Sequence, residues 1–141
     1  MKKILSLVAV VALFTGCASG PKFSQVKSTI PPVAQDHGRI YFYRNSVAGA
    51  AVQPAVRLND QEVGRATSKG FFYVDRTPGS YEVKTITEVT RRLSLNLDQG
   101  QTRYVRLNIA MGFFVGHVYP ELVENAIGEK EIQNCSYTGG K

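Results

Sequence analysis

A two-residue period of apolar side chains dominates the chain from Gly38 onward and constrains its fold more than any other feature. This period is typical of a β-strand with one buried face. It recurs in about eight short segments, which turn residues separate at the spacing that sandwiches and small barrels show. The alternating apolar residues include Ile40, Phe42, Val56, Leu58, Val83, Leu93, Leu95, Leu97, Val105, Leu107 and Ile109. The pattern predicts an all-β domain over residues 38–141, an antiparallel β-sandwich of about seven or eight strands.

Two turns and one helix are predicted within this domain. The segment 59–61, Asn-Asp-Gln, makes a tight connection between two strands. The segment 77–80, Thr-Pro-Gly-Ser, predicts a type II turn, because proline presets the second position and glycine tolerates the positive φ of the third. Pro120 at a first-turn position, followed by acidic residues, predicts a short C-terminal helix that ends at Gly128.

The segment 109–116 is apolar at the positions of both strand faces. Such a segment is either buried on both sides or exposed in part as a contact patch. We expect burial, within a last apolar strand over residues 110–119.

The first residues have the order of an export signal, because Lys2 and Lys3 precede an apolar run over 4–14. The segment 14–17, Phe-Thr-Gly-Cys, resembles the bacterial lipobox, whose cysteine is alkylated with diacylglycerol and becomes the first residue of the mature protein. The resemblance implies a signal peptide over 1–16 and lipid attachment at Cys17. Cleavage of an ordinary secretion signal after Ala18 is the alternative.

A lipid anchor of two or three acyl chains holds a protein on a membrane permanently. Ala18, in place of the aspartate that retains such proteins at the inner membrane, resembles the sorting signal for the outer membrane. The expected location is therefore the periplasmic face of the outer membrane. Residues 17–37 are rich in proline and small polar residues and show no sustained period, which predicts a flexible tether.

Cys135 is the second of the two cysteines. If the Cys17 sulfur carries lipid, the two cysteines cannot form a disulfide bond. Because polar residues flank Cys135 close to the end of the chain, we expect an accessible or partly accessible thiol.

The charged and titratable residues indicate no catalytic or nucleic-acid site. The chain carries 17 Lys and Arg against 11 Asp and Glu, spread along its length rather than clustered as in a nucleic-acid binder. Its two histidines, His37 and His117, form no paired metal motif, and we expect neither a metal nor another cofactor. No nucleophile elbow or phosphate loop is present, so we expect no enzymatic activity.

Several segments together resemble the bacterial lipoprotein domain known as domain of unknown function 2846, over about residues 38–133. The segments are GRIYFYR at 38–44, VRLN at 56–59, GFFYV at 70–74, PGSYEV at 78–83, YVR at 104–106 and GHVYP at 116–120. The resemblance implies a small β-domain on a lipid anchor and no assigned activity. The PGSYEV segment also resembles the turn and strand of transthyretin-like sandwiches, and an immunoglobulin-like sandwich fits the pattern equally.

Four residues are candidates for ligand binding. Arg57, Arg92 and Arg106 occupy the polar positions of their strands, and Tyr104 lies near Arg106. On adjacent strands they form a cationic surface, and the arginine fork suits the carboxylates of peptidoglycan or the phosphates of lipid. The alternative is the hydrated outer face of a one-sided sheet.

The sequence therefore predicts a lipid-anchored, non-catalytic interaction or structural module of the cell envelope, whose partner is an envelope protein or peptidoglycan. Two alternatives remain. The first is a binder of anionic envelope ligands, which includes an inhibitor of wall-degrading enzymes. The second is an unrecognised hydrolase.

Overall fold

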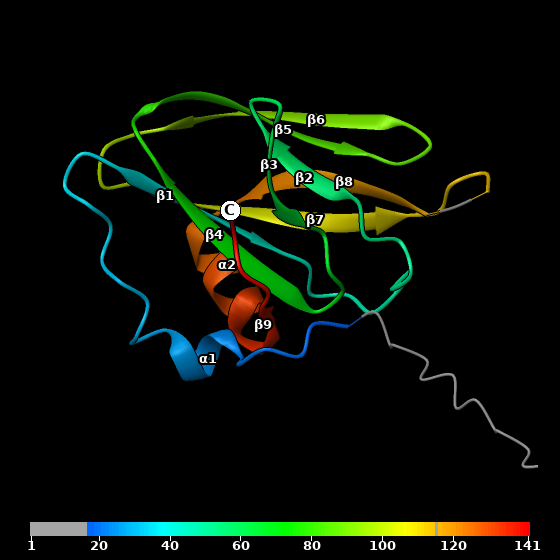
Figure 1. The fold of residues 1–141 in the computed structure, drawn as a ribbon, viewed down its shortest axis with the longest axis horizontal. Coiled ribbons are helices and arrows are strands. Elements are labelled where there is room, and N and C mark those ends of the chain that lie inside the picture. The colour runs from blue at the N-terminus through cyan, green and yellow to red at the C-terminus, as the bar shows by residue number, and fades with distance from the viewer. Residues whose placement is uncertain (1–16, 115) are drawn as a thin grey trace, which may run out of the picture.

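The computed structural model describes residues 17–114 and 116–141, so the predicted signal peptide lies outside the described residues. Two β-sheets pack against each other, with two helices outside them (Figure 1). The strands are β1 (Gly38–Tyr43), β2 (Ala55–Leu58), β3 (Gln61–Arg65), β4 (Gly70–Arg76), β5 (Gly79–Ile86), β6 (Thr90–Leu97), β7 (Thr102–Ala110), β8 (His117–Val123) and β9 (Ser136–Tyr137). The helices are α1 (Phe23–Val26) and α2 (Asn125–Glu131), and a 3-10 turn, η1 (Ile132–Asn134), follows α2.

The predicted all-β sandwich with one short C-terminal helix is confirmed. One sheet has the strand order β8-β7-β1-β4-β9 and the other has β3-β2-β5-β6. The second sheet is antiparallel, as predicted. The first is mixed, because β1 pairs parallel with β7 and β4 pairs parallel with β9. Between β1 and β7 the chain forms β2 and β3 of the second sheet, then β4 beside β1, and then β5 and β6 of the second sheet. This long crossover permits the parallel pair of β1 and β7.

The main core lies between the sheets and is made by the predicted alternation. Ile40 and Phe42 of β1 face Val83 and other buried residues of the second sheet. The ring of Phe42 stacks on that of Phe72, with centroids 4.9 Å apart. The period of two therefore identified the inner faces of β1, β2, β5, β6 and β7 correctly.

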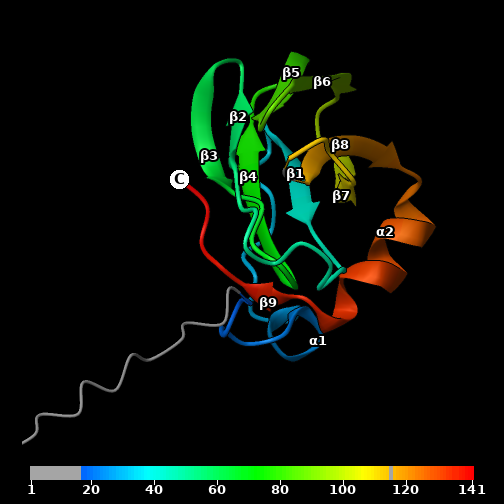
Figure 2. The ribbon, with the colours of Figure 1, turned by 90° about the vertical axis from the view of Figure 1, so that its right-hand side faces the viewer.

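A second core covers the outer face of the five-stranded sheet. Tyr41 and Tyr43 of β1 point outward, opposite to Ile40 and Phe42, and pack under Phe23 of α1. Phe23 N–H donates to the Cys135 carbonyl at 2.9 Å, so α1 and the segment before β9 lie side by side (Figure 2). All six residues of β1 are consequently buried.

The prediction of a flexible tether over 17–37 is therefore wrong for the part that contacts the sheet. Phe23 is buried, and Val26 and Ile30 pack against the same outer core. Their spacing of three and four residues is that of an apolar helix stripe, which gives this segment apolar area to bury. Tyr137 N–H also donates to the Pro21 carbonyl at 2.9 Å.

The predicted helix over 120–128 is displaced toward the C-terminus. Pro120 lies in β8 opposite Leu107, on an edge strand, where a residue without an N–H is tolerated. Gly128 lies within α2, and a Cβ atom at this position would be 2.3 Å from Cγ of Tyr104. This glycine permits a close approach of α2 to the sheet instead of ending the helix.

The two turn predictions have different outcomes. The tight connection after β2 is confirmed, and Asn59 and Asp60 both have positive φ, as a two-residue hairpin requires. The type II turn over 77–80 is wrong, because Gly79 does not have positive φ and already belongs to β5. This segment crosses from one sheet to the other, and the Tyr81 hydroxyl holds it by donating to the Thr77 carbonyl at 2.6 Å.

The expected burial of 109–116 is wrong at the centre of the segment. β7 ends at Ala110, β8 begins at His117, and Met111, Phe113 and Phe114 are exposed in the loop between them. Position 115 lies outside the described residues. The local sequence resembles a buried strand, but no neighbouring element covers it within the described part of the chain.

The expected accessibility of Cys135 is also wrong. The residue is fully buried in the outer core, and its thiol donates to the Arg44 carbonyl at 3.7 Å. Burial raises the pKa of this thiol to about 11. The polar neighbours Asn134 and Ser136 misled the prediction, because Cys135 sits between η1 and β9 and points into the protein.

Arg44 occupies the most unusual position in the fold. It follows β1 directly, and its side chain is completely buried. The guanidinium donates to the carbonyls of Val52 and Ala66 through one nitrogen, at 2.6 and 2.9 Å, and to those of Ala48 and Gly49 through the other, also at 2.6 and 2.9 Å. Among the described residues no carboxylate pairs with it. Backbone carbonyl dipoles therefore stabilise the buried cation. Three of the four carbonyls belong to the 45–54 loop, which surrounds the guanidinium.

We expect Arg44→Met to destabilise the protein by about 3 kcal/mol or more, because the substitution leaves buried carbonyls without a donor. Arg65→Met is the matched control, since Arg65 is exposed and donates one bond to the Gln53 carbonyl. Its expected effect is within about 0.5 kcal/mol. Urea denaturation measures both free energies of unfolding. Equal losses in the two variants would contradict a clamping role for Arg44.

Candidate functional site

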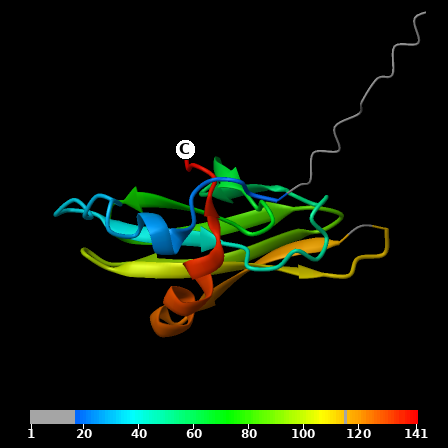
Figure 3. The same cartoon turned by 90° about the horizontal axis from the view of Figure 1, so that it is seen from below.

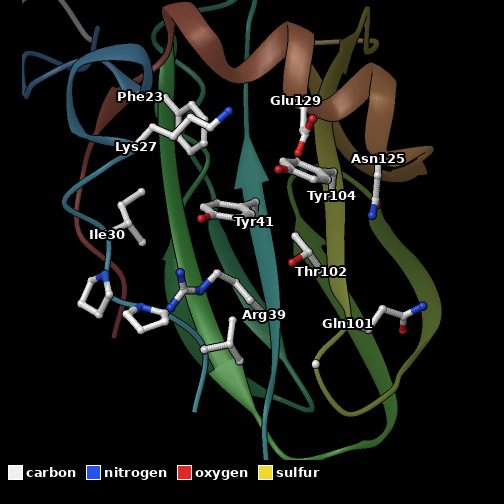
Figure 4. Close-up of a pocket in the computed structure, with 14 residues that line it drawn as sticks. Phe23, Lys27, Ile30, Arg39, Tyr41, Gln101, Thr102, Tyr104, Asn125 and Glu129 are labelled. Carbon is white, nitrogen blue, oxygen red and sulfur yellow. The ribbon is translucent and has the colours of Figure 1, made fainter. Parts of the chain in front are cut away.

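A groove of about 590 Å³ crosses the outer face of the five-stranded sheet (Figure 4). Its walls are the N-terminal segment 23–33 on one side and α2 on the other, and β1 and β7 form its floor. We call it the outer groove. It is lined by Phe23, Lys27, Ile30, Pro31, Pro32, Val33, Arg39, Tyr41, Gly100, Gln101, Thr102, Tyr104, Asn125 and Glu129. The outer groove thus depends on two segments that lie far apart in the sequence.

The floor of the outer groove is aromatic and rigid. Tyr41 and Tyr104 occupy paired positions of β1 and β7, and their rings stack with centroids 5.2 Å apart and an angle of 14°. Phe23 meets the Tyr41 ring edge-on at 5.6 Å. Burial raises the pKa of the Tyr104 phenol, so this hydroxyl stays protonated at neutral pH. Tyr41 and Tyr104 are 7% and 3% exposed, so the floor presents only a small part of each ring.

The charges around the outer groove nearly balance. Arg39 is neutralised by Asp75, which accepts two hydrogen bonds at 2.6 and 2.8 Å, and its guanidinium lies 4.4 Å from the centre of the Tyr73 ring. The bond to Asp75 raises the pKa of Arg39. Lys27 lies on one wall and Glu129 on the other (Figure 4). The outer groove therefore suits a polar ligand that carries charges of both signs better than a purely anionic one.

Tyr104 is the one predicted ligand-binding residue that lines the outer groove. Arg106 is on the same strand face but lies nearer to α2 and β8, where it donates to Glu131 at 2.7 Å and to Glu121 at 2.9 Å. Tyr43 donates to the same Glu131 at 2.5 Å. Arg106 therefore fastens α2 and β8 to the sheet and is not available as a free cation for a ligand.

Arg57 and Arg92 lie on the other sheet, so the four predicted residues do not form one surface. Arg57 pairs in register with Lys84 of β5, and Lys84 pairs with Arg92 of β6. These three residues form a basic row across three strands. Lys84 contacts Asp60, and Arg92 lies 3.5 Å from Glu82. The hydrogen bond from Lys84 is the main cause of a lowered pKa at Asp60. Neighbouring acids thus offset part of the charge of the basic row.

Lys84 and most of the outer groove are missing from the sequence-based set. Lys84 was detectable, because it has a polar position in a strand between the strands of Arg57 and Arg92. Lys27 was not predicted as a site residue, because residues 17–37 were interpreted as a flexible tether. The apolar spacing around Lys27 nevertheless indicated a docked helix. Asn125 and Glu129 were not predicted, because they line the outer groove only where α2 lies against the sheet, which no local pattern indicates.

One further pair of titratable residues lies away from the outer groove and the basic row. His117 pairs with Glu88 at 2.9 Å, and this carboxylate also accepts the backbone N–H of Phe114 at 2.7 Å. Glu88 thus links two neighbouring loops. In the parts of the chain that the structure describes, no group of three or more His, Cys, Asp or Glu residues could hold a metal ion.

The contacts of Arg106 predict how acid affects stability. The bonds from Arg106 and then Asn108 lower the pKa of Glu121 in the folded protein. This contribution to stability is fully present above the unfolded pKa and is lost as pH falls through the lowered folded pKa. Because the Glu121 side chain is 45% exposed, we expect a loss of only about 0.5 kcal/mol below pH of about 4.

Urea denaturation across the acidic range measures this effect. Glu121→Gln should flatten the acid dependence, whereas Glu124→Gln, a control at an exposed position close by, should keep the wild-type profile. Identical profiles for Glu121→Gln and the wild type would show that the pair with Arg106 adds nothing to stability.

Comparison with known proteins identifies a family. A protein of Haemophilus influenzae (strain ATCC 51907 / DSM 11121 / KW20 / Rd), named "Uncharacterized protein", is 27% identical over 137 residues, which cover 93% of this chain and 81% of that protein. No solved structure matches the chain. The family model described as "Protein of unknown function (DUF2846)" matches residues 34–118, which is more than half of the chain. The chain therefore belongs to the DUF2846 family.

Proposed function

We propose that the protein is a lipid-anchored module of the bacterial outer membrane, whose β-sandwich faces the periplasm and acts by non-catalytic interaction. The observation that carries the proposal is the different exposure of the two cysteines. Cys17, where the lipobox resemblance places the lipid, is exposed, whereas Cys135 is buried in the outer core. Cys17 is thus accessible to a modifying enzyme in the folded domain.

A backbone contact of the residue that follows Cys17 is consistent with an anchor there. The backbone N–H of Ala18 donates to the Ser68 carbonyl at 2.9 Å, so the described chain begins at the surface of the sandwich. Among the described residues, no helix is long and apolar enough to cross a membrane.

Lipidation at Cys17 is the first test of the proposal. When the full chain is expressed in a bacterium with a labelled fatty-acid analogue, the wild type should take up the label and Cys17→Ser should not. Cys135→Ser is the matched control and should be labelled like the wild type. Mass spectrometry of the mature chain should find diacylglycerol on an N-terminal Cys17. A mature chain that starts at Ser19 without lipid would contradict the proposal.

A second candidate function is binding of peptidoglycan in the outer groove. It is favoured by the mixed chemistry of the rim, where Lys27 and Glu129 face a ligand together with the side-chain amides of Gln101 and Asn125. Peptidoglycan carries amide-bearing sugars, ammonium groups and carboxylates, which match donors and acceptors of both signs. The basic row is the alternative surface, and it suits phosphate or carboxylate ligands.

Co-sedimentation with purified peptidoglycan distinguishes the two surfaces. We expect Lys27→Ala with Asn125→Ala to reduce the bound fraction about tenfold, because both residues are at the rim and neither belongs to a core. Arg57→Gln with Arg92→Gln is the control variant and should bind like the wild type. The reverse result, with a salt-sensitive loss in the arginine variant alone, would assign binding to the basic row.

A further inference from the structure

The loop between β7 and β8 exposes three large apolar side chains within four residues. Met111, Phe113 and Phe114 are 95%, 89% and 85% exposed, more than any other large apolar residue of the described chain. The rings of Phe113 and Phe114 contact each other at 4.8 Å and otherwise face solvent. Such a projecting cluster is costly in water and typical of a surface that a partner or a membrane covers.

The neighbouring loop between β5 and β6 extends this apolar cluster. Its Glu88 accepts the backbone N–H groups of Phe113 and Phe114, at 3.2 and 2.7 Å, which places the two loops side by side. Ile86 and Val89, on either side of Glu88, are 52% and 38% exposed. Because the two N–H groups of the β7–β8 loop already have an acceptor, its tip can leave water without unpaired donors at Phe113 and Phe114.

A chain of contacts connects Cys17 to the same end of the sandwich. Cys17 forms an isolated parallel bridge with Ser68, whose hydroxyl donates to the Ser46 carbonyl at 2.8 Å. Gly49, in the same 45–54 loop, approaches Ile109 so closely that a Cβ atom would lie 2.4 Å from Cδ1 of Ile109. Ile109 precedes the β7–β8 loop by two residues. Figures 1 and 3 show the first described residues and this loop toward the same end of the long axis.

Cationic and amphipathic side chains lie behind the apolar tip. Arg91 and Arg92 of β6 line a surface pocket together with Ala110, the last residue of β7, and Tyr119 of β8. Both arginines are exposed, and Tyr119 is 36% exposed. Proteins that contact a bilayer commonly place arginine beside anionic headgroups and tyrosine at the interface, below apolar residues that enter the lipid. The side chains at this end of the sandwich follow the same order.

We propose that the β7–β8 loop inserts Met111, Phe113 and Phe114 into the bilayer that holds the lipid of Cys17. The protein is then attached at two points, one covalent and one formed by the loop. This inference rests on the proposed lipid anchor, because the anchor brings the loop end of the sandwich to a membrane. A lipid surface fits better than a protein groove, since the apolar residues form a projecting tip flanked by cations.

A tryptophan in the loop tests the insertion directly, because the chain has no tryptophan of its own. Phe113→Trp is made in the full, lipidated protein and reconstituted into vesicles of phosphatidylcholine and phosphatidylglycerol with brominated acyl chains. We expect blue-shifted emission and quenching of more than half of the fluorescence by the bromine atoms. Ile127→Trp on α2 is the matched control, since Ile127 is also exposed, and its emission should be unquenched.

Three results would contradict the inference or its basis. Equal accessibility of the two tryptophans to aqueous iodide, with lipid present on Cys17, would overturn loop insertion and leave the anchor intact. Blue-shifted emission without bromine quenching, in a sample that forms dimers, would assign the loop to a second copy of the chain. A mass spectrum without lipid on Cys17 would instead overturn the proposed function, and the two-point attachment with it.

Discussion

The structure depends on one buried cation more than on any other contact. Arg44 directly follows β1, where the chain passes toward the second sheet. Four backbone carbonyls surround its guanidinium. Its own carbonyl accepts the thiol of Cys135 from the C-terminal segment. The side chain of Arg44 is fully buried, and this burial lowers its pKa. Arg44 thus organises three parts of the fold. They are the 45–54 loop, the end of the β2–β3 hairpin and the outer core.

Both cores share β1, which explains why the N-terminal segment and the C-terminal segment are needed together. The inner side chains of β1 belong to the core between the sheets, and the outer ones, Tyr41 and Tyr43, need a separate cover. Phe23 from one end of the chain and Ile132 from the other supply that cover. The outer groove is the part of this face that the two segments leave open. The proposed binding surface is therefore a by-product of closing a second core.

Local patterns predicted what depends on neighbouring residues and missed what depends on distant ones. The period of two found the strands, and Asn59-Asp60 found the hairpin, because both signals act within a few residues. The signals at Pro120 and Gly128 were interpreted as helix boundaries, but an edge strand tolerates the proline and the ring of Tyr104 requires the glycine. The separation of Arg106 from Arg57 and Arg92 likewise follows from sheet order, which no local spacing encodes.

The docking of residues 18–30 on the sandwich changes how far the domain can travel on the proposed anchor. A free linker of this length would let the domain sample a hemisphere of roughly 20 Å radius, with every orientation accessible. A docked segment removes the reach of such a linker, so a domain held by the proposed anchor stays close to the lipid. On the proposed anchor, the outer groove moves with the domain by lateral diffusion along the membrane and does not search the volume beyond it. Such a geometry selects ligands that are themselves presented close to the membrane surface.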